Sequence, residues 1–168
     1  MDNRQPSDSQ ALAARLRVLE DKEELRSLIN AYQAASDDMD YGRQVSVFTP
    51  DGEFDTPIGV LRGPQAIKAA LIAAETDFKF KFHMITNLEF VIDGEKATGR
   101  GNLLFTNLHN PSRPHLHDEN GRAVGGSIGG GSYDWQFVRT SEGWRIKYQK
   151  LALTWFGSPM LPYTEKST

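Results

Sequence analysis

Residues 78–93, FKFKFHMITNLEFVID, mark the point at which the sequence changes from helical to strand periodicity. From Phe78 to His83, aromatic and polar side chains alternate strictly. The phenylalanines therefore share one face of a predicted strand, and the lysines and His83 share the other. An Asp-Gly turn at residues 93–94 leads into a second predicted strand, KATGRGNLLFTNLH, as in a β-hairpin.

The sequence before this hairpin has helical periodicity. Apolar residues recur every three or four positions between residues 9 and 36, which predicts one or two amphipathic helices. Asp21 is a candidate N-cap for the second of these helices. A short helix is expected around residues 43–48, an irregular hairpin over residues 53–63, and a further helix that opens at Pro64.

The sequence after the hairpin predicts a long polar loop over residues 109–126 and two more strands. The glycine run GGSIGGG at residues 125–131 is typical of a β-bulge, or of a place where bulky side chains are kept out of a cavity. The segments GGSYDWQFVRT and GWRIKYQKLALTWFG follow as strands joined by a Ser-Glu-Gly turn. Helices therefore precede long antiparallel strands, which predicts an α+β fold and disfavours alternating βαβ units.

The whole chain has the size of a single domain, with 168 residues and a net charge of −3. We expect one domain over residues 1–168, with a core of about residues 9–157 and loose ends on either side. The acidic balance disfavours nucleic-acid binding. The absence of cysteine excludes disulfides, thiolate metal sites and a cysteine nucleophile. No signal peptide or membrane-spanning apolar run is visible, so we expect a cytoplasmic protein with no membrane partner.

The four histidines lie within 35 residues of one another, at positions 83, 109, 115 and 117. His115 and His117 have a spacing found among metal ligands on a strand, but no glutamate completes the set and proline and glycine flank it. A loop is therefore favoured there, and no metal site is predicted. His83 is the best candidate general base because imidazole titrates near neutral pH, and a structural role is the alternative.

Carboxylates follow the first predicted helix at Asp37, Asp38 and Asp40. A solvated acidic turn is the simplest interpretation. Carboxylates at a helix C-terminus are disfavoured by the helix dipole, however, which favours another role for at least one of them. Tyr32 lies on the apolar face of the same helix, and its hydroxyl needs a hydrogen-bond partner if it is buried.

In their order, these pieces resemble the SnoaL-like branch of the nuclear-transport-factor-2-like superfamily. The motifs that carry the resemblance are Leu25-x-x-Leu-Ile-x-x-Tyr32, Asp37-x-x-Asp40, Phe48-x-x-Asp51-Gly, Gly63-Pro64-x-x-Ile67, FHMITNLEF and the closing GWRI. The resemblance implies a cone-like α+β barrel. In such a barrel a curved, mostly antiparallel sheet wraps around the N-terminal helices and encloses a deep apolar pocket.

Within that superfamily the pattern is most similar to dehydratases and dehydrochlorinases, such as scytalone dehydratase, bile-acid dehydratase and hexachlorocyclohexane dehydrochlorinase. These enzymes pair an Asp after the first helix with a His on the first long strand, and the matching residues here are Asp37 and His83. Tyr32 matches a tyrosine that several dehydratases use, and Asp40 matches a more structural second Asp. The resemblance implies a cofactor-independent lyase or isomerase that acts on a hydrophobic, cyclic small molecule.

The same resemblance implies a set of substrate-binding residues. Leu103, Phe105 and Tyr133 match positions that line the pocket in dehydrochlorinase-like members, whereas Trp135 shares the face of Tyr133 only if no bulge intervenes. Gln149 stands where some relatives carry an arginine that stabilises a departing anion. This difference weakens the case for elimination of a halide or a carboxylate, and it leaves dehydration and isomerisation as possible reactions. Thr56 replaces the acidic base of ketosteroid isomerase, which disfavours that chemistry.

A non-catalytic role is the alternative. The superfamily also contains β subunits of ring-hydroxylating dioxygenases, which build oligomers, and polyketide cyclase-like enzymes. A homodimer or homotrimer is implied by the resemblance, and the last two predicted strands carry apolar residues on both faces. A filled pocket with an exposed apolar sheet face would favour the assembly role, and an Asp37–His83 contact inside a cavity would favour the enzyme.

Overall fold

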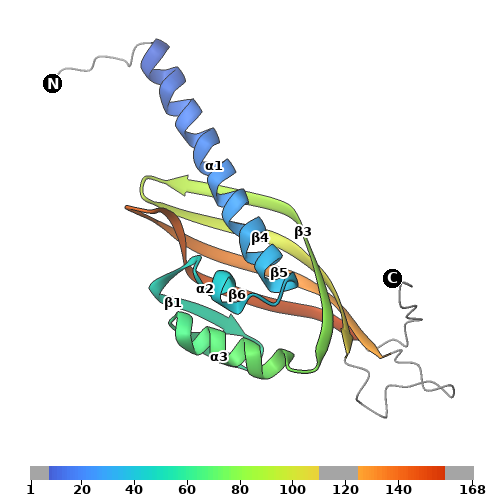
Figure 1. Ribbon diagram of the computed structural model, residues 1–168. Helices are drawn as coiled ribbons and strands as arrows, with labels where there is room; N and C mark the ends of the chain where they lie inside the picture. The colour runs from blue at the N-terminus through green and yellow to red at the C-terminus, as the bar shows by residue number, and fades with distance from the viewer. Residues whose placement is uncertain (1–7, 110–124, 158–168) are drawn as a thin grey trace, which may run out of the picture.

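The computed structural model describes residues 8–109 and 125–157 (Figure 1). Three helices and two short strands come first: α1 (Asp8–Asp37), α2 (Tyr41–Val45), β1 (Phe48–Thr56), β2 (Gly59–Arg62) and α3 (Pro64–Glu75). Four long strands follow: β3 (Phe78–Asp93), β4 (Lys96–His109), β5 (Gly126–Thr140) and β6 (Gly143–Gly157). This order confirms the predicted α+β class.

The strands form one six-stranded sheet in the order β2-β1-β6-β5-β4-β3. Every neighbouring pair is antiparallel except β1 and β6, which are parallel. Because β2 and β3 are the two edges, the sheet does not close into a complete barrel. Figure 1 shows the sheet curving around the helices, which cover one of its faces. The predicted curved, mostly antiparallel sheet is therefore confirmed.

The N-terminal helical region is a single helix, which agrees with the first of the two alternatives, so Asp21 is not an N-cap. No proline or glycine interrupts α1, and Asp21 serves a tertiary contact instead of a cap. Its carboxylate is buried and accepts hydrogen bonds from the Arg139 guanidinium and from the Trp144 indole N–H at 3.4 Å. The first half of α1 projects past the sheet in Figure 1. There the side chains of Leu12, Leu16 and Leu19 are exposed.

The turns and short elements agree with the sequence in most places. The β1–β2 hairpin, the opening of α3 at Pro64 and the turn between β3 and β4 are as predicted. The short helix lies earlier than expected, at Tyr41–Val45, and Phe48 begins β1 instead of ending that helix. The reason is the side chain of Asp40, which caps α2 by accepting a hydrogen bond from the Arg43 backbone N–H at 3.0 Å.

The glycine run in β5 makes room for neighbouring groups, and it contains a bulge. The β5–β6 register shifts between Gly130 and Gly131. A Cβ atom added at Gly129 would lie 2.5 Å from the Phe105 ring, and one at Gly131 would lie 2.0 Å from the Ala152 carbonyl oxygen. The expected bulge is therefore confirmed. The close approaches show that the glycines make room for packed groups of β4 and β6, whereas the expectation that they border a cavity is not confirmed.

The core lies between the helices and the inner face of the sheet. Leu25 and Ile29 of α1 belong to one buried cluster with aromatic side chains of β5 and β6, including Trp135, Phe137 and Trp144. Of the helices in the described residues, none is long and apolar enough to cross a membrane.

Candidate active site

Asp37 and His83 are in direct contact, although they are far apart in the sequence. Asp37 is the last residue of α1, and one of its carboxylate oxygens lies 2.6 Å from Nδ1 of His83 on β3. The other carboxylate oxygen accepts a hydrogen bond from the His83 backbone N–H at 3.2 Å. A carboxylate at Nδ1 favours the tautomer in which Nδ1 carries the proton, which leaves Nε2 free to accept one.

β3 turns its polar face inward and its aromatic face outward. The Lys81 side chain is 1% exposed and the His83 side chain 13% exposed, whereas Phe80 and Phe82 are 47% and 46% exposed. The alternation is as predicted, and the structure settles which face lines the interior. His83 is therefore a cavity residue and not a solvent residue.

A cavity of about 330 Å³ lies between α1, α3 and the inner face of the sheet. It is lined by His83 and Tyr32 and by the predicted pocket residues Leu103, Phe105 and Tyr133. Most of the other lining side chains are apolar, among them Phe54, Ile58, Leu61, Leu71, Leu151 and Leu153. The His83 ring stacks on Phe105 with the ring centres 6.0 Å apart. Five of the predicted site residues therefore line the same cavity. Their roles in catalysis and substrate binding stay predictions.

Tyr32 presents a hydroxyl group to this cavity. The side chain is buried, and its oxygen accepts a hydrogen bond from Nε2 of Gln149 at 2.9 Å. Burial raises the pKa of Tyr32 to about 12, so the hydroxyl stays protonated at neutral pH. The hydrogen bond from Gln149 uses a lone pair of the oxygen and not its proton. The Gln44 side chain also lies against this hydroxyl.

Gln149 does not line the cavity, although it was predicted to contact the substrate. It instead holds the Tyr32 hydroxyl through a hydrogen bond. The side chain is fully buried behind Tyr32, and its carbonyl oxygen accepts a hydrogen bond from the Trp135 indole at 2.8 Å. Trp135 shares the face of Tyr133, with stacked rings whose centres are 5.3 Å apart. The Trp135–Gln149–Tyr32 chain therefore fixes the position of the hydroxyl.

Four polar residues beside the pair were not predicted from the sequence. Lys81 donates a hydrogen bond to Ser36 Oγ at 3.0 Å and forms an ion pair with Glu75, which lines the cavity at the end of α3. Asn107 also lines the cavity. The usable signal was strand parity: once His83 faces inward, Lys81 must face inward too.

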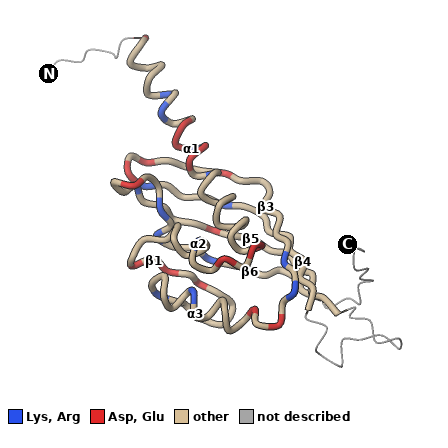
Figure 2. The backbone as a smooth tube through the Cα atoms, in the orientation of Figure 1, with Lys and Arg blue, Asp and Glu red and all other residues tan. Residues whose placement is uncertain are grey.

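The other acidic residues near Asp37 have structural roles. Asp38 forms an ion pair with Arg43, and Asp40 caps α2. Figure 2 shows acidic positions close to the junction of α1 and α2. Of the three carboxylates, Asp37 alone makes the contact with His83, so the acidic-turn interpretation holds for its two neighbours.

Of the other histidines, His109 falls within the described residues and makes its ring contact elsewhere. His109 is the last residue of β4, which agrees with the predicted strand and not with the loop range that began at the same residue, and it packs edge-on against Phe78 at 5.3 Å between ring centres. The predictions for His115 and His117 fall outside the described residues. Within residues 8–109 and 125–157, no group of three or more His, Asp or Glu side chains is placed to hold a metal ion.

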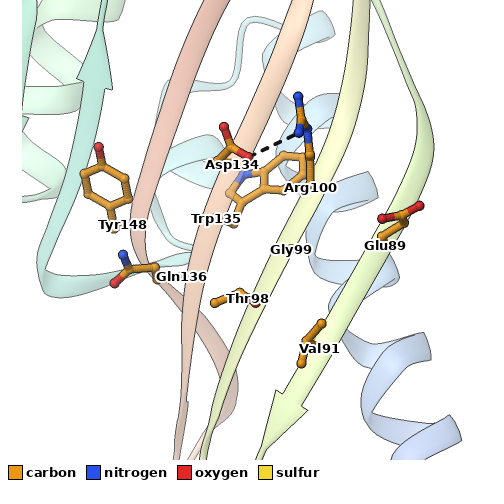
Figure 3. A pocket seen from close by; sticks show the side chains of 9 residues that line it. All are labelled: Glu89, Val91, Thr98, Gly99, Arg100, Asp134, Trp135, Gln136 and Tyr148. Atoms are coloured by element: carbon orange, nitrogen blue, oxygen red, sulfur yellow. Dashed lines mark ion pairs between the residues drawn. The ribbon is translucent and has the colours of Figure 1, made fainter.

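A second depression lies on the outer face of the sheet, shown in Figure 3. Arg100 and Asp134 face each other across it at 3.9 Å. Glu89, Thr98, Gln136 and Tyr148 also line it, and none of the predicted site residues does. This surface is polar and open, so it offers no dry environment for a base.

The sequence matches the SnoaL-like domain family over residues 17–150. This chain belongs to the SnoaL-like family. The match spans α1 to β6 and thus includes both Asp37 and His83. The resemblance drawn from the sequence motifs is therefore confirmed at the level of the family.

Solved structures with the same fold include a dehydrochlorinase and a candidate dehydratase. A hexachlorocyclohexane dehydrochlorinase (LinA, type 2) is 18% identical with a TM-score of 0.70, over 95% of this chain and 98% of the other. A candidate scytalone dehydratase from Novosphingobium aromaticivorans is 19% identical with a TM-score of 0.71, over 89% and 97% of the two chains. An NTF2-like protein with a cystatin-like fold from the same species is 27% identical with a TM-score of 0.66, over 90% and 92%. No curated protein matches this chain.

Proposed function

We propose that this SnoaL-like protein is a cofactor-independent lyase or isomerase that removes a proton from carbon in a hydrophobic, cyclic small molecule. The observation that carries the proposal is the 2.6 Å contact between His83 Nδ1 and Asp37 in the wall of a mostly apolar cavity. The dehydratase and dehydrochlorinase named among the structural neighbours support a reaction of this type.

The chemistry begins at Nε2 of His83, which accepts the proton. The electron pair of the broken C–H bond then forms a carbon–carbon double bond. In an elimination, a hydroxide or another leaving group departs from the adjacent carbon. In an isomerisation, the electrons move onto a carbonyl oxygen and return to a different carbon with the proton. The Asp37 carboxylate stabilises the imidazolium that forms in either case.

Tyr32 serves as the hydrogen-bond donor to the substrate. Its O–H donates a hydrogen bond to the carbonyl or departing oxygen, where negative charge develops. The raised pKa of about 12 keeps this donor protonated throughout the working pH range. The apolar lining lowers the local dielectric constant, which strengthens both the Tyr32 contact and the Asp37–imidazolium attraction.

A general probe of proton abstraction tests the proposal without knowledge of the natural substrate. In 5-nitrobenzisoxazole, removal of the ring C–H proton breaks the N–O bond and releases a coloured phenolate, with no other reactant needed. We expect the wild-type protein to accelerate this ring opening, and His83→Ala to lose about 100-fold or more of the acceleration. An unchanged rate in His83→Ala, with the fold intact by circular dichroism, would contradict the proposal.

A second copy of the chain is the proposed protein partner. Five large apolar side chains on the outer face of the sheet are each more than a third exposed: Phe80, Phe82, Met84, Leu104 and Trp155. Met84 pairs with Leu104, and Leu104 with Gly130, over which the Trp155 ring lies, so these side chains form one continuous patch. Soluble monomers rarely expose such a patch, and we propose that it packs against another copy.

A further inference from the structure

A row of buried polar side chains crosses the inner face of the sheet next to His83. Lys81 on β3 pairs with Asn107 on β4, and Asn107 pairs with Ser127 on β5. These residues are only 1%, 6% and 3% exposed. The neighbouring row, two residues along the strands, is His83, Phe105 and Gly129. A polar row in a mostly apolar wall needs a physical reason, because buried polar groups are costly unless they are bonded.

All but one of the side-chain polar atoms in this row have a hydrogen-bond or ion-pair partner, either within the row or on a neighbouring helix. Lys81 is bonded to Ser36 and paired with Glu75. The side-chain N–H of Asn107 donates to Ser127 Oγ at 3.2 Å. The side-chain carbonyl oxygen of Asn107 is buried and has no hydrogen-bond partner within the described part of the chain. Such an unsatisfied acceptor lowers stability and is uncommon in folded proteins.

Asn107 also lines the cavity that contains His83. We propose that Asn107 forms a second polar subsite in this cavity, where its side-chain oxygen accepts a hydrogen bond from a hydroxyl group of the ligand. This inference rests on the proposed function, since it places the ligand in the cavity of the Asp37–His83 pair. The ligand completes a hydrogen bond that the protein leaves open.

The geometry and charge of the row define the class of ligand. Rows two residues apart along a strand are separated by about 7 Å, which is the scale of one six-membered ring with its substituent. The charge of Lys81 is already balanced by Glu75, so the subsite selects a neutral hydroxyl and not a carboxylate. The substrate class is thus a hydroxylated ring, with the hydroxyl at Asn107 and the C–H that reacts on the other side, near His83.

The test compares two bicyclic probes that differ in one hydrogen-bond donor. 2-Naphthol carries the hydroxyl, and 2-methoxynaphthalene carries the same oxygen without the proton. Wild-type protein should bind 2-naphthol about tenfold more tightly, the value of one well-placed hydrogen bond. Asn107→Leu should remove this preference, and Asn102→Leu, an exposed residue on the outer face of the same strand, should retain it. Equal binding of the two probes by the wild type, or a preference that survives in Asn107→Leu, would overturn the proposal.

Two further readouts separate this inference from a folding defect and from the proposed reaction. Asn107→Leu should melt close to the wild-type temperature, because it removes one unsatisfied acceptor but also the hydrogen bond to Ser127 Oγ. If it does not fold, the wild-type probe comparison still decides the question. His83→Gln should retain the preference for 2-naphthol while losing the ring opening of 5-nitrobenzisoxazole. Retained ring opening in His83→Gln would refute the proposed function and leave the subsite standing. Loss of the 2-naphthol preference in His83→Gln would count against an independent subsite.

Discussion

The two faces of β3 differ in a way that reverses the usual sorting of side chains. The inner face buries a lysine and a histidine, Lys81 and His83, whereas the outer face leaves Phe80 and Phe82 nearly half exposed. The buried polar groups are tolerated because each has a charged partner, Glu75 for Lys81 and Asp37 for His83. Hydrophobicity alone therefore does not identify the core face of a strand that lines a site. This arrangement is the one that the proposed ligand cavity and the proposed self-association surface each require.

The largest expected effect comes from breaking the buried ion pair of the inner face. Lys81→Met leaves Glu75 without its cation in a nearly dry site, and we expect a loss of about 3–5 kcal/mol in the free energy of unfolding. Urea denaturation measures this loss. Lys147→Met is the matched control, because Lys147 pairs with Asp51 at the surface and should matter little. A Lys81→Met protein as stable as the wild type would show that the fold does not depend on the Lys81–Glu75 ion pair of the inner face.

The next effect concerns the orientation of His83. Asp37→Asn keeps the shape of the side chain but removes the charge that fixes the tautomer and stabilises the imidazolium. We expect about a 100-fold decrease in the rate of 5-nitrobenzisoxazole ring opening, with little change in the melting temperature. Asp38→Asn is the control, since Asp38 pairs with Arg43 outside the cavity. Similar rates in the two variants would remove the reason for assigning Asp37 a role in the reaction.

A smaller effect follows from the titration of Tyr32. Its pKa is raised from 10.0 to about 12 in the folded chain, so the unfolded chain ionises first. The stability that Tyr32 contributes is complete below pH 10 and is lost as the pH rises towards about 12. Between about pH 10 and about pH 11, the unfolding free energy should fall by about 1 kcal/mol less in Tyr32→Phe than in the wild type. Identical pH dependence in the two proteins would show that the Tyr32 hydroxyl is not buried as described.

The smallest effect on the stability of the fold is expected on the outer face. Substitutions there should change the self-association of the chain instead. Replacing Phe80 and Phe82 together by Thr should change the stability of the single chain by less than about 1 kcal/mol. The same change should shift the molar mass in light scattering from a dimer or trimer towards a monomer. Val91→Thr, which alters an exposed residue outside the apolar patch, should leave the mass unchanged. A wild-type protein that is monomeric at high concentration would refute the proposed self-association.

Much of the fold follows from local patterns in the sequence. The α+β order, the turn at residues 93–94 and the start of α3 at Pro64 each depend on neighbouring residues, and all are confirmed. The position of Asp21 could not be predicted in the same way, because its partner Arg139 lies 118 residues away. The displacement of Gln149 behind Tyr32 depends on the β5–β6 register, which shifts twice along the pair.

The candidate site also contains residues that were predicted and residues that were not. The resemblance to known enzymes predicted which residues gather around His83, and the structure places Tyr32, Leu103, Phe105 and Tyr133 in its cavity. The buried polar row was not predicted, because the alternation of β3 allows either face to point inward. Only the packing of α1 and α3 against the sheet decides that Lys81 and His83 are the inner residues.

The most direct test of the account is the rate of 5-nitrobenzisoxazole ring opening by variants on the two faces of β3. His83→Ala removes the proposed base on the inner face, and Phe82→Ala removes the preceding side chain on the outer face. We expect a loss of about 100-fold or more for His83→Ala and a rate close to that of the wild type for Phe82→Ala. Equal rates for the two variants would contradict the claim that the inner face carries the reaction.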